Sequence, residues 1–269
     1  MFRSLARSLA LALVAATVAA AGVAAQAPAQ AQAATPAQLS ALAPSNIAKA
    51  RPKAPFDLTG NWFIDNSPGI QGWLFGPAAI PKLTPAAQKH RDAYVKAIAE
   101  GKVYRDDIGQ CWPAGVPIIM TRVWPIAMIQ MPTAIYMVSE FMNSLRTVFL
   151  DGRAHTDPDI VVRTFNGESV GRWEGDTLVV ETRNFIDDEH HWVDQGVPAS
   201  GELRIVERIR MVGTQLEIAM TLTDPKNWEG EWKGVRRWNR VNDIDVQEVE
   251  CRPDLNEHLQ STSSKVHVR

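Results

Sequence analysis

The sequence predicts a mainly β protein, built as a single antiparallel meander barrel with one flanking helix. The first observation is a β-hairpin at residues 167–181, where Gly175 supplies the positive φ of a tight turn and residues 177–182 alternate with β-branched side chains. The second is a series of further short strand patterns separated by turn residues. A barrel with this many strands is expected to enclose a cavity suited to one small molecule.

Strand patterns recur along the chain after the helix, and turn signals such as Pro132-Thr133 and Gly213-Thr214 separate them. The first strand is expected within residues 61–65. The others are expected at 123–131, 134–141, 145–150, 169–173, 177–183, 202–211, 216–223, 233–240 and 245–251. One helix is predicted between Thr84, as its N-cap, and Gly101. Its thin apolar stripe indicates a lid or flank of the barrel rather than a core element.

The N-terminal region has the composition of a targeting segment. Residues 1–25 place Arg3 and Arg7 before an apolar run, which is typical of a secretory signal peptide, with a retained signal anchor as the alternative. Residues 26–55 are rich in Ala, Gln and Pro and are predicted to be a disordered leader. The barrel domain is expected over 56–253 and a polar tail over 254–269. We therefore expect a periplasmic or secreted protein without stable membrane insertion after signal cleavage.

Charge and motifs exclude several classes of function. The formal net charge is −2 and no stripe of Lys and Arg is present, so we expect no nucleic-acid partner. Gly-x-Gly-x-x-Gly, the phosphate loop and the Gly-x-Ser-x-Gly nucleophile elbow are all missing from the sequence. We therefore expect no cofactor and no serine-hydrolase chemistry. The expected partner is a small apolar or aromatic molecule.

The two cysteines, Cys111 and Cys251, are the number needed for one disulfide in an exported chain. Such a bond would close a loop of about 140 residues and stabilise the fold by about 4 to 5 kcal/mol in the chain-entropy model. Two buried free thiols are the alternative. Neither possibility gives a catalytic cysteine, because the sequence has no Cys-x-x-Cys pair.

Residues 60–62, Gly-Asn-Trp, resemble the Gly-x-Trp signature of lipocalins and related calycin barrels. In those barrels an arginine from the last strands stacks over the tryptophan and closes one end by a cation–π contact. Arg236, Arg237 and Arg240 are the candidates here. The resemblance implies a lipocalin-like barrel in which Arg236, or failing that Arg240, covers the indole.

A longer motif resembles a large family of exported bacterial proteins, most of which lack an assigned function. It consists of residues 169–182, Ser-Val-Gly-Arg-Trp-Glu-Gly-Asp-Thr-Leu-Val-Val-Glu-Thr, with 151–155 before it and 206–208 after it. The resemblance covers roughly 111–232 and implies export and a lipocalin-like barrel, but transfers no activity. A histidine is expected beside Ser200 in that family. This chain has Ala199 there, so histidine-dependent chemistry is not carried over.

Glu207 is the best candidate for a titrating group inside the barrel. It shares a predicted strand face with apolar side chains, namely Leu203, Ile205, Ile209 and Met211. A carboxylate in that position either has a raised pKa and acts as a general acid or base, or pairs with an arginine such as Arg146 or Arg163. Glu140, which shares its predicted face with Tyr136, has the same two possibilities.

Residues 187–194 concentrate carboxylates and imidazoles between two predicted strands, where a barrel rim is expected. Three interpretations remain open. The segment is an acid/base site using His190 or His191 with Asp187 or Asp194, a metal site shared with His155, or a solvated acidic loop. Adjacent histidines in an extended segment point to opposite sides, and no spacing such as His-Glu-x-x-His favours a metal, so no metal ligand is assigned.

The chain is rich in large apolar side chains, with nine tryptophans and eight methionines, and the methionines are also flexible. Trp192 and Trp228 lie in predicted loops and are candidates for the mouth of a ligand cavity. Five methionines fall in or near two strands and either fill the core or form a deformable wall: Met120, Met128, Met131, Met137 and Met142.

Two hypotheses follow. In the first, the protein is a cofactor-independent lyase or isomerase that transfers protons on an apolar or aromatic substrate. Its expected catalytic residues are Glu207, His190 and His191. Its expected substrate-binding residues are Glu140, Tyr136, Arg146, Trp192 and Trp228. In the second, the same cavity belongs to a non-catalytic periplasmic ligand-binding or carrier protein.

Overall fold

A computed structural model describes residues 39–50, 54–65, 80–105, 107–194 and 196–256. By its internal contacts the chain divides into residues 1–38 and 39–269, and every described residue belongs to the second unit. The predicted signal peptide therefore lies outside the described residues, as does the predicted tail from residue 257 onward.

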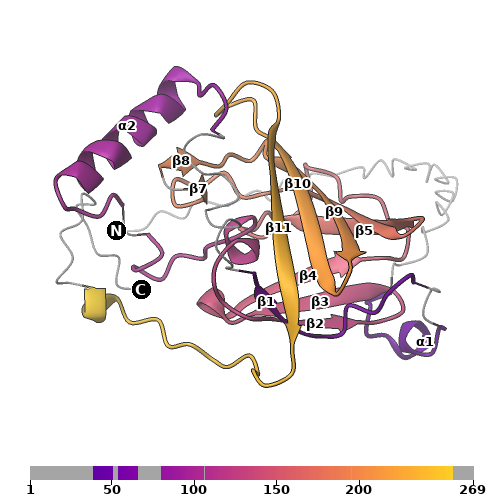
Figure 1. Ribbon diagram of the computed structural model, residues 1–269. Helices are drawn as coiled ribbons and strands as arrows, with labels where there is room; N and C mark the ends of the chain where they lie inside the picture. Colours follow the sequence, from indigo (N-terminus) through magenta and orange to yellow (C-terminus); the bar gives the residue numbers. More distant parts are fainter. Residues whose placement is uncertain (1–38, 51–53, 66–79, 106, 195, 257–269) are drawn as a thin grey trace, which may run out of the picture. The chain divides into compact units, whose positions relative to one another are not determined.

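Nine strands in the described part of the chain close a barrel, drawn at the centre of Figure 1. Their order around the barrel is β1, β11, β10, β9, β6, β5, β4, β3 and β2, and β2 pairs with β1 to complete the circle. The strands are β1 (Gly60–Ile64), β2 (Ile126–Gln130), β3 (Ala134–Ser139), β4 (Ser144–Phe149), β5 (Glu168–Glu174), β6 (Thr177–Arg183), β9 (Arg204–Val212), β10 (Gln215–Thr223) and β11 (Trp232–Val241). The mainly β barrel predicted from the sequence is confirmed.

Two features depart from a simple meander. Strand β5 runs parallel to β4 and pairs with it only at Val148–Ser169 and Phe149–Val170, because a long crossover, residues 150–167, connects them instead of a tight turn. The chain between β6 and β9 forms a separate ribbon of two short strands, β7 (Trp192–Asp194) and β8 (Val197–Pro198). Around the barrel, β6 therefore pairs directly with β9.

Residues 245–251, predicted as the last strand, form no strand. We call residues 244–251 the C-terminal strap. Side chains hold its backbone: the Asn143 amide donates to the Val249 carbonyl at 2.7 Å and accepts from the Val249 N–H at 2.9 Å, and Glu140 accepts from the Gln247 N–H at 3.2 Å. The alternating pattern of this segment thus reflects an extended chain that is bonded by side chains and not by a strand ladder.

One end of the barrel is closed by an arginine over the tryptophan of β1, as the resemblance to calycin barrels implies. The residue is Arg240, the second of the two expected candidates, and not Arg236. Its guanidinium lies 4.6 Å from the Trp62 ring and donates to the Thr59 and Asp57 carbonyls at 2.5 and 2.6 Å. Gly60 has φ 142°, and a Cβ there would lie 2.9 Å from Arg240 Nη1, so glycine is needed at this close approach.

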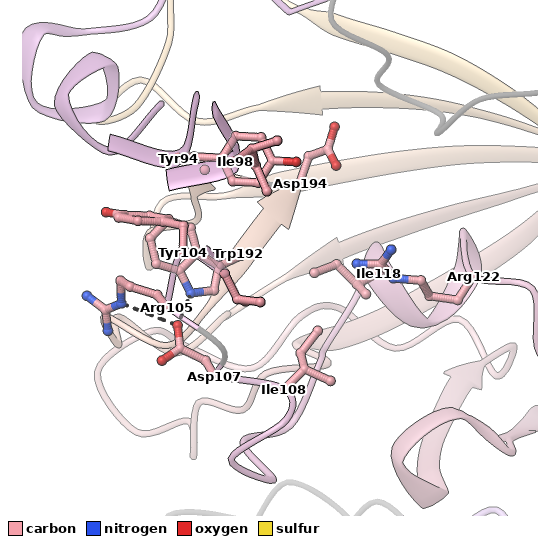
Figure 2. Close-up of a pocket in the computed structure, with 12 residues that line it drawn as sticks. Tyr94, Ile98, Tyr104, Arg105, Asp107, Ile108, Ile118, Arg122, Trp192 and Asp194 are labelled. Carbon is pink, nitrogen blue, oxygen red and sulfur yellow. Dashed lines mark hydrogen bonds and ion pairs between the residues drawn. The ribbon is translucent and has the colours of Figure 1, made fainter. Parts of the chain in front are cut away.

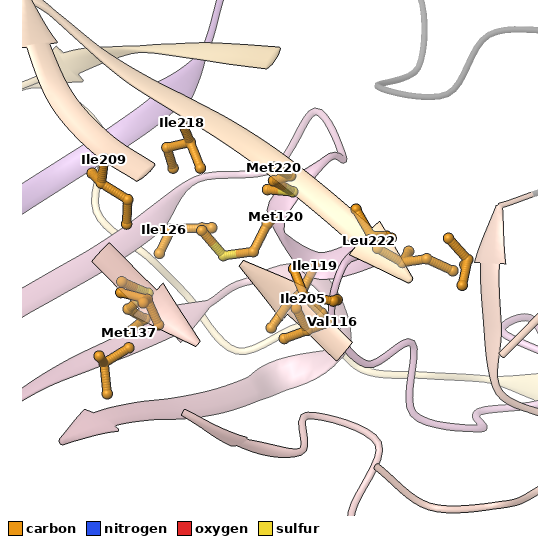
Figure 3. Packing of buried hydrophobic residues seen from close by; sticks show 14 of the residues in the cluster. Val116, Ile119, Met120, Ile126, Met137, Ile205, Ile209, Ile218, Met220 and Leu222 are labelled. Atoms are coloured by element: carbon orange, nitrogen blue, oxygen red, sulfur yellow. The ribbon is translucent and has the colours of Figure 1, made fainter. Parts of the chain in front are cut away.

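The barrel interior, where we expected a ligand, holds side chains of the chain itself (Figure 3). A short 3₁₀ helix, η2 (Ile118–Met120), precedes β2 and supplies part of this filling. Ile119 and Met120, with exposed fractions of 2% and 0%, lie among side chains of the surrounding strands. These partners include Ile126, Met137, Ile205, Ile209, Ile218, Met220 and Leu222. Met128 and Met137 are also buried, so these methionines fill the core.

The predicted flanking helix is α2 (Pro85–Ala99), and its N-cap is Thr84, whose hydroxyl accepts from the Ala87 N–H at 3.4 Å. Helix α2 contacts β8. Gly196, in the turn between β7 and β8, has φ 72°, and a Cβ there would lie 2.6 Å from Tyr94 Cβ. The helix is therefore packed closely on the β7–β8 ribbon.

The disulfide between Cys111 and Cys251 is confirmed, with its Cα atoms 5.8 Å apart. It joins the C-terminal strap to the segment that follows α2. Three short helical segments complete the described chain: α1 (Pro44–Ile47), η3 (Phe141–Asn143) and η4 (Pro253–Asn256). Helix α1 lies within residues 26–55, for which we expected a disordered leader. In the described part of the chain, no helix combines the length and apolar character that a membrane span requires.

Candidate functional site

Glu207 lies inside the barrel in a complete ion pair with Arg146. Arg146 Nη1 donates to Glu207 Oε1 at 3.1 Å, and Arg146 Nη2 contacts Glu207 Oε2. The same guanidinium donates to Ser169 Oγ at 3.1 Å and to Thr182 Oγ1 at 3.0 Å. Both charged side chains are almost fully buried, at 1% and 0% exposed. Of the two possibilities that the sequence left open, this geometry corresponds to the internal ion pair.

His191 is fully buried between Phe165 and Phe185, whose ring centroids are each 5.5 Å from the imidazole. Burial lowers the pKa of His191 to about 4, although the backbones of Val116 and Ile186 act in the opposite direction. Neither ring nitrogen completes a hydrogen bond with any described residue. The imidazole is therefore neutral near pH 7.

His190 faces a different environment from His191. It stacks on Trp112 with ring centroids 3.7 Å apart, and its Nδ1 lies 2.7 Å from Asp188 Oδ1. The His191 N–H donates to the Asp188 backbone carbonyl at 3.0 Å, so the two histidines share Asp188, whereas Glu207 contacts a separate group of residues around Arg146. Within the described residues, no three His, Cys, Asp or Glu side chains are grouped as a metal site would require.

The predicted substrate-binding residues are also dispersed. Tyr136 lies on the face of β3 opposite the buried Met137, and Glu140 holds the C-terminal strap. Trp228 is buried against Trp232 at 5.5 Å. Trp192, also of this set, lines a pocket.

That pocket, which we call the side pocket, lies outside the barrel, against α2, residues 103–105 and 107–108, η2 and the β7–β8 ribbon (Figure 2). Its volume is about 320 Å³, within the range of small-molecule sites. Its apolar wall consists of Tyr94, Ile98, Val103, Tyr104, Ile108, Ile118 and Trp192. Four charged side chains complete it: Arg105, Asp107, Arg122 and Asp194.

Trp192 is held rigidly at the aromatic end of the side pocket. Its indole Nε1 donates to Asp107 Oδ2 at 2.7 Å, and the Arg105 guanidinium lies 5.3 Å from the ring. Tyr104 meets the indole edge-on at 6.1 Å, and the Tyr104 hydroxyl lies 2.8 Å from His90 Nδ1. Aromatic rings fixed in this way, one buried and one half-buried, form a preorganised surface for a planar ligand.

Burial perturbs the charged groups of the side pocket. It raises the pKa of Asp107, against the opposing effects of Arg105 and of the hydrogen bond from Trp192. It lowers the pKa of Arg122 to about 10, and the charges of Asp194 and Tyr94 reverse only part of this shift. Perturbed titrating groups beside an apolar wall are typical of binding and catalytic sites.

Apart from Trp192 and the acidic loop that contains Asp194, no sequence pattern indicated this pocket. Tyr104, Asp107 and Arg122 lie in segments without a recognisable motif. Tyr104 and Asp107 meet Trp192, and Arg122 lies across the pocket from it, only because α2 folds onto the β7–β8 ribbon and η2 enters the barrel core. The spacing of apolar residues within one segment does not indicate which distant segments will pack together.

Residues of the long family motif and its surroundings make structural hydrogen bonds. Glu168 accepts from the N–H and hydroxyl of Thr156 at 2.8 and 2.6 Å and from the Asn184 amide at 3.0 Å. Burial acts to raise the pKa of Glu168, but these bonds keep it below its ordinary value. Ser200, beside the position where the family histidine is expected, donates its hydroxyl to the buried Asp224 at 2.7 Å.

Comparison with known proteins finds no family for this chain. No family model matches the chain, and no curated protein matches it. Among solved structures, the chain is similar to a variant of the fluorescent protein UnaG, with 14% identity, a TM-score of 0.33, and coverage of 69% of this chain and 97% of that one. A zebrafish ileal bile acid-binding protein complexed with cholic acid matches at 13% identity and a TM-score of 0.33, with coverage of 68% and 98%. At these TM-scores the matches carry no argument about this chain.

Proposed function

We propose that this chain is an exported, non-catalytic binding protein that holds one small apolar or aromatic molecule in the side pocket. The observation that carries the proposal is the pocket itself, which combines a fixed aromatic wall with a few buried charged groups. Small-molecule sites have this composition. Export, into the periplasm or beyond, rests on the signal-peptide pattern of residues 1–25.

Proton transfer inside the barrel is less well supported than binding. A general acid or base must reach the proton that it moves. Both oxygens of Glu207 are engaged by Arg146, and the side chain is fully buried. His191 is equally buried and lies against a different set of side chains. These contacts favour the binding hypothesis over the lyase or isomerase hypothesis.

The test uses two matched variants of α2. Ile98 lines the side pocket and Val95 does not, yet the two side chains have nearly equal exposure, 53% and 52%. Ile98→Trp places an indole at the pocket, whereas Val95→Trp places the same group elsewhere on the helix surface. Both variants are expected to fold, because neither position is buried.

Binding of 2-naphthol to the full chain is measured by titration calorimetry. The wild type and Val95→Trp are expected to bind one molecule per chain with similar affinity, and Ile98→Trp is expected to bind at least about 10-fold more weakly, the effect of losing about 1.4 kcal/mol of contact. The proposal is overturned if the wild type shows no saturable binding. It is also overturned if the two variants bind equally.

A further inference from the structure

Asp107 is a buried carboxylate in the lining of the side pocket, with an exposed fraction of only 6%. Figure 2 shows it below Trp192 and beside Arg105, at the aromatic end of the pocket. A carboxylate removed from water needs hydrogen-bond donors at both of its oxygens, because each unpaired acceptor costs free energy. The donors around the two oxygens of Asp107 therefore show what a ligand can add.

The two oxygens of Asp107 have different surroundings. Trp192 Nε1 donates to Oδ2 at 2.7 Å, and Arg105 Nε donates to the same oxygen at 3.3 Å. Oδ1, by contrast, accepts no hydrogen bond from the side chains or backbone of the described residues. One oxygen thus holds the carboxylate in place against the indole, and the other is available to a donor group of a ligand.

Arg105 already supplies a positive charge to this carboxylate. Besides its contact with Asp107, its guanidinium lies 5.3 Å from the Trp192 ring and 3.2 Å from the exposed Glu189. A second cation placed at Oδ1 would lie close to Arg105 and be repelled by it. The site therefore favours a neutral O–H or N–H donor over an ammonium group.

The aromatic rings beside Asp107 use their own polar atoms within the chain. The Trp192 N–H is engaged by Asp107, and the Tyr104 hydroxyl lies 2.8 Å from His90 Nδ1. These rings therefore offer a ligand mainly their carbon surfaces, against which another aromatic ring packs well. The hydrogen bond that orients such a ligand is left to the Asp107 carboxylate.

Resting on the function proposed above, we infer that the ligand is a neutral aromatic hydrogen-bond donor, such as a phenol, whose ring lies against Trp192 and Tyr104 and whose O–H donates to Asp107 Oδ1. A hydrogen bond to an ionised carboxylate is about twice as strong as one between neutral groups. An aromatic ether of similar shape has no proton to donate. The side pocket therefore selects its ligand by this donor as well as by shape.

The test compares 2-naphthol with 2-methoxynaphthalene, which lacks the O–H, by titration calorimetry on the full chain at pH 7. Wild type is expected to prefer 2-naphthol by about 10- to 100-fold, the range for a hydrogen bond to a charged group. In Asp107→Asn the amide oxygen is needed by the Trp192 N–H, so the NH₂ group takes the place of Oδ1. An NH₂ group donates to either probe, and the preference is expected to disappear.

Glu189→Gln is the matched control. Glu189 is the other carboxylate bound by Arg105, but its side chain is 72% exposed and does not line the side pocket. This variant removes the same charge from the same arginine and is expected to keep the wild-type preference for 2-naphthol. The comparison of the two probes on wild type needs no variant, so it tests the inference even if Asp107→Asn does not fold.

The outcomes separate this inference from the proposed function. Equal binding of both probes to wild type overturns the inference and leaves the side pocket as a binding site. A preference that persists in Asp107→Asn also overturns it, because the extra methyl group of the ether would then be the cause. An equal loss in Asp107→Asn and Glu189→Gln overturns it as well, since net charge would explain both. If neither probe binds, the inference and the proposed function are both wrong.

Discussion

The buried imidazole of His191 should make the stability of the fold depend on pH in a range where few other groups titrate. An unfolded chain protonates this side chain with a pKa near 6.5, whereas burial lowers the pKa in the folded state to about 4. Between these values the unfolded state binds one more proton than the native state. Stability is therefore full above pH 6.5 and falls as the pH is lowered towards 4.

The size of the effect follows from the same shift. Between pH 7 and pH 5, a lowering from 6.5 to about 4 reduces the free energy of unfolding by about 2 kcal/mol. His90 contributes in the same direction, because burial and Arg105 lower its pKa, and Asp107 in the opposite direction, because burial raises its pKa. Both contributions remain when only His191 is changed. Comparing wild type with a His191 variant therefore isolates the contribution of His191 to the pH dependence of the free energy of unfolding.

The assay is urea unfolding of wild type and His191→Leu at pH 7 and pH 5, with the disulfide intact. Leucine has a similar volume and suits the apolar surroundings of Phe165 and Phe185. The variant is expected to lose about 2 kcal/mol less than wild type between the two pH values. If both proteins lose the same amount, His191 is not the neutral buried group that we describe.

Three further changes test the barrel. Glu207→Gln leaves the Arg146 charge buried without its partner and should cost about 3 to 5 kcal/mol in urea unfolding; an intact fold with lost ligand affinity would contradict this purely structural role. Arg240→Gln removes the cover of the β1 indole and should cost about 1 to 3 kcal/mol, and unchanged stability would refute its role in closure. Reducing the Cys111–Cys251 bond, which spans 140 residues, should cost about 5 kcal/mol. Denatured but unreduced protein should contain no titratable thiol.

Local patterns predicted the elements whose conformation is decided locally. Gly175 has φ 62° in the turn between β5 and β6, and Thr84 and Pro85 begin α2, both as the sequence indicated. The burial of Glu207 was also predictable, because the two-residue period of a strand fixes which side chains share a face. The same period was wrong for the C-terminal strap, since alternation does not show whether a partner strand exists.

The candidate site depends on packing between distant parts of the chain. Arg122 and Asp107 carry no motif, and their position against Trp192 requires both the entry of η2 into the core and the docking of α2. The filling of the barrel interior by η2 was missed for the same reason. Strand number sets the size of the barrel, but it does not show that another segment of the chain fills the interior.

The pairing of β1 with β11 has a consequence for the order in which the fold can form. Asn61 pairs with Val241, so β1 cannot complete its pairing before β11 has been synthesised. Cys251, which closes the disulfide, follows β11 in the sequence. During synthesis from the N-terminus, one edge of β1 stays open for as long as β11 is missing. Contacts this distant in sequence form slowly, and open strand edges pair readily with other chains. Closure of the barrel is therefore the step at which folding competes with aggregation.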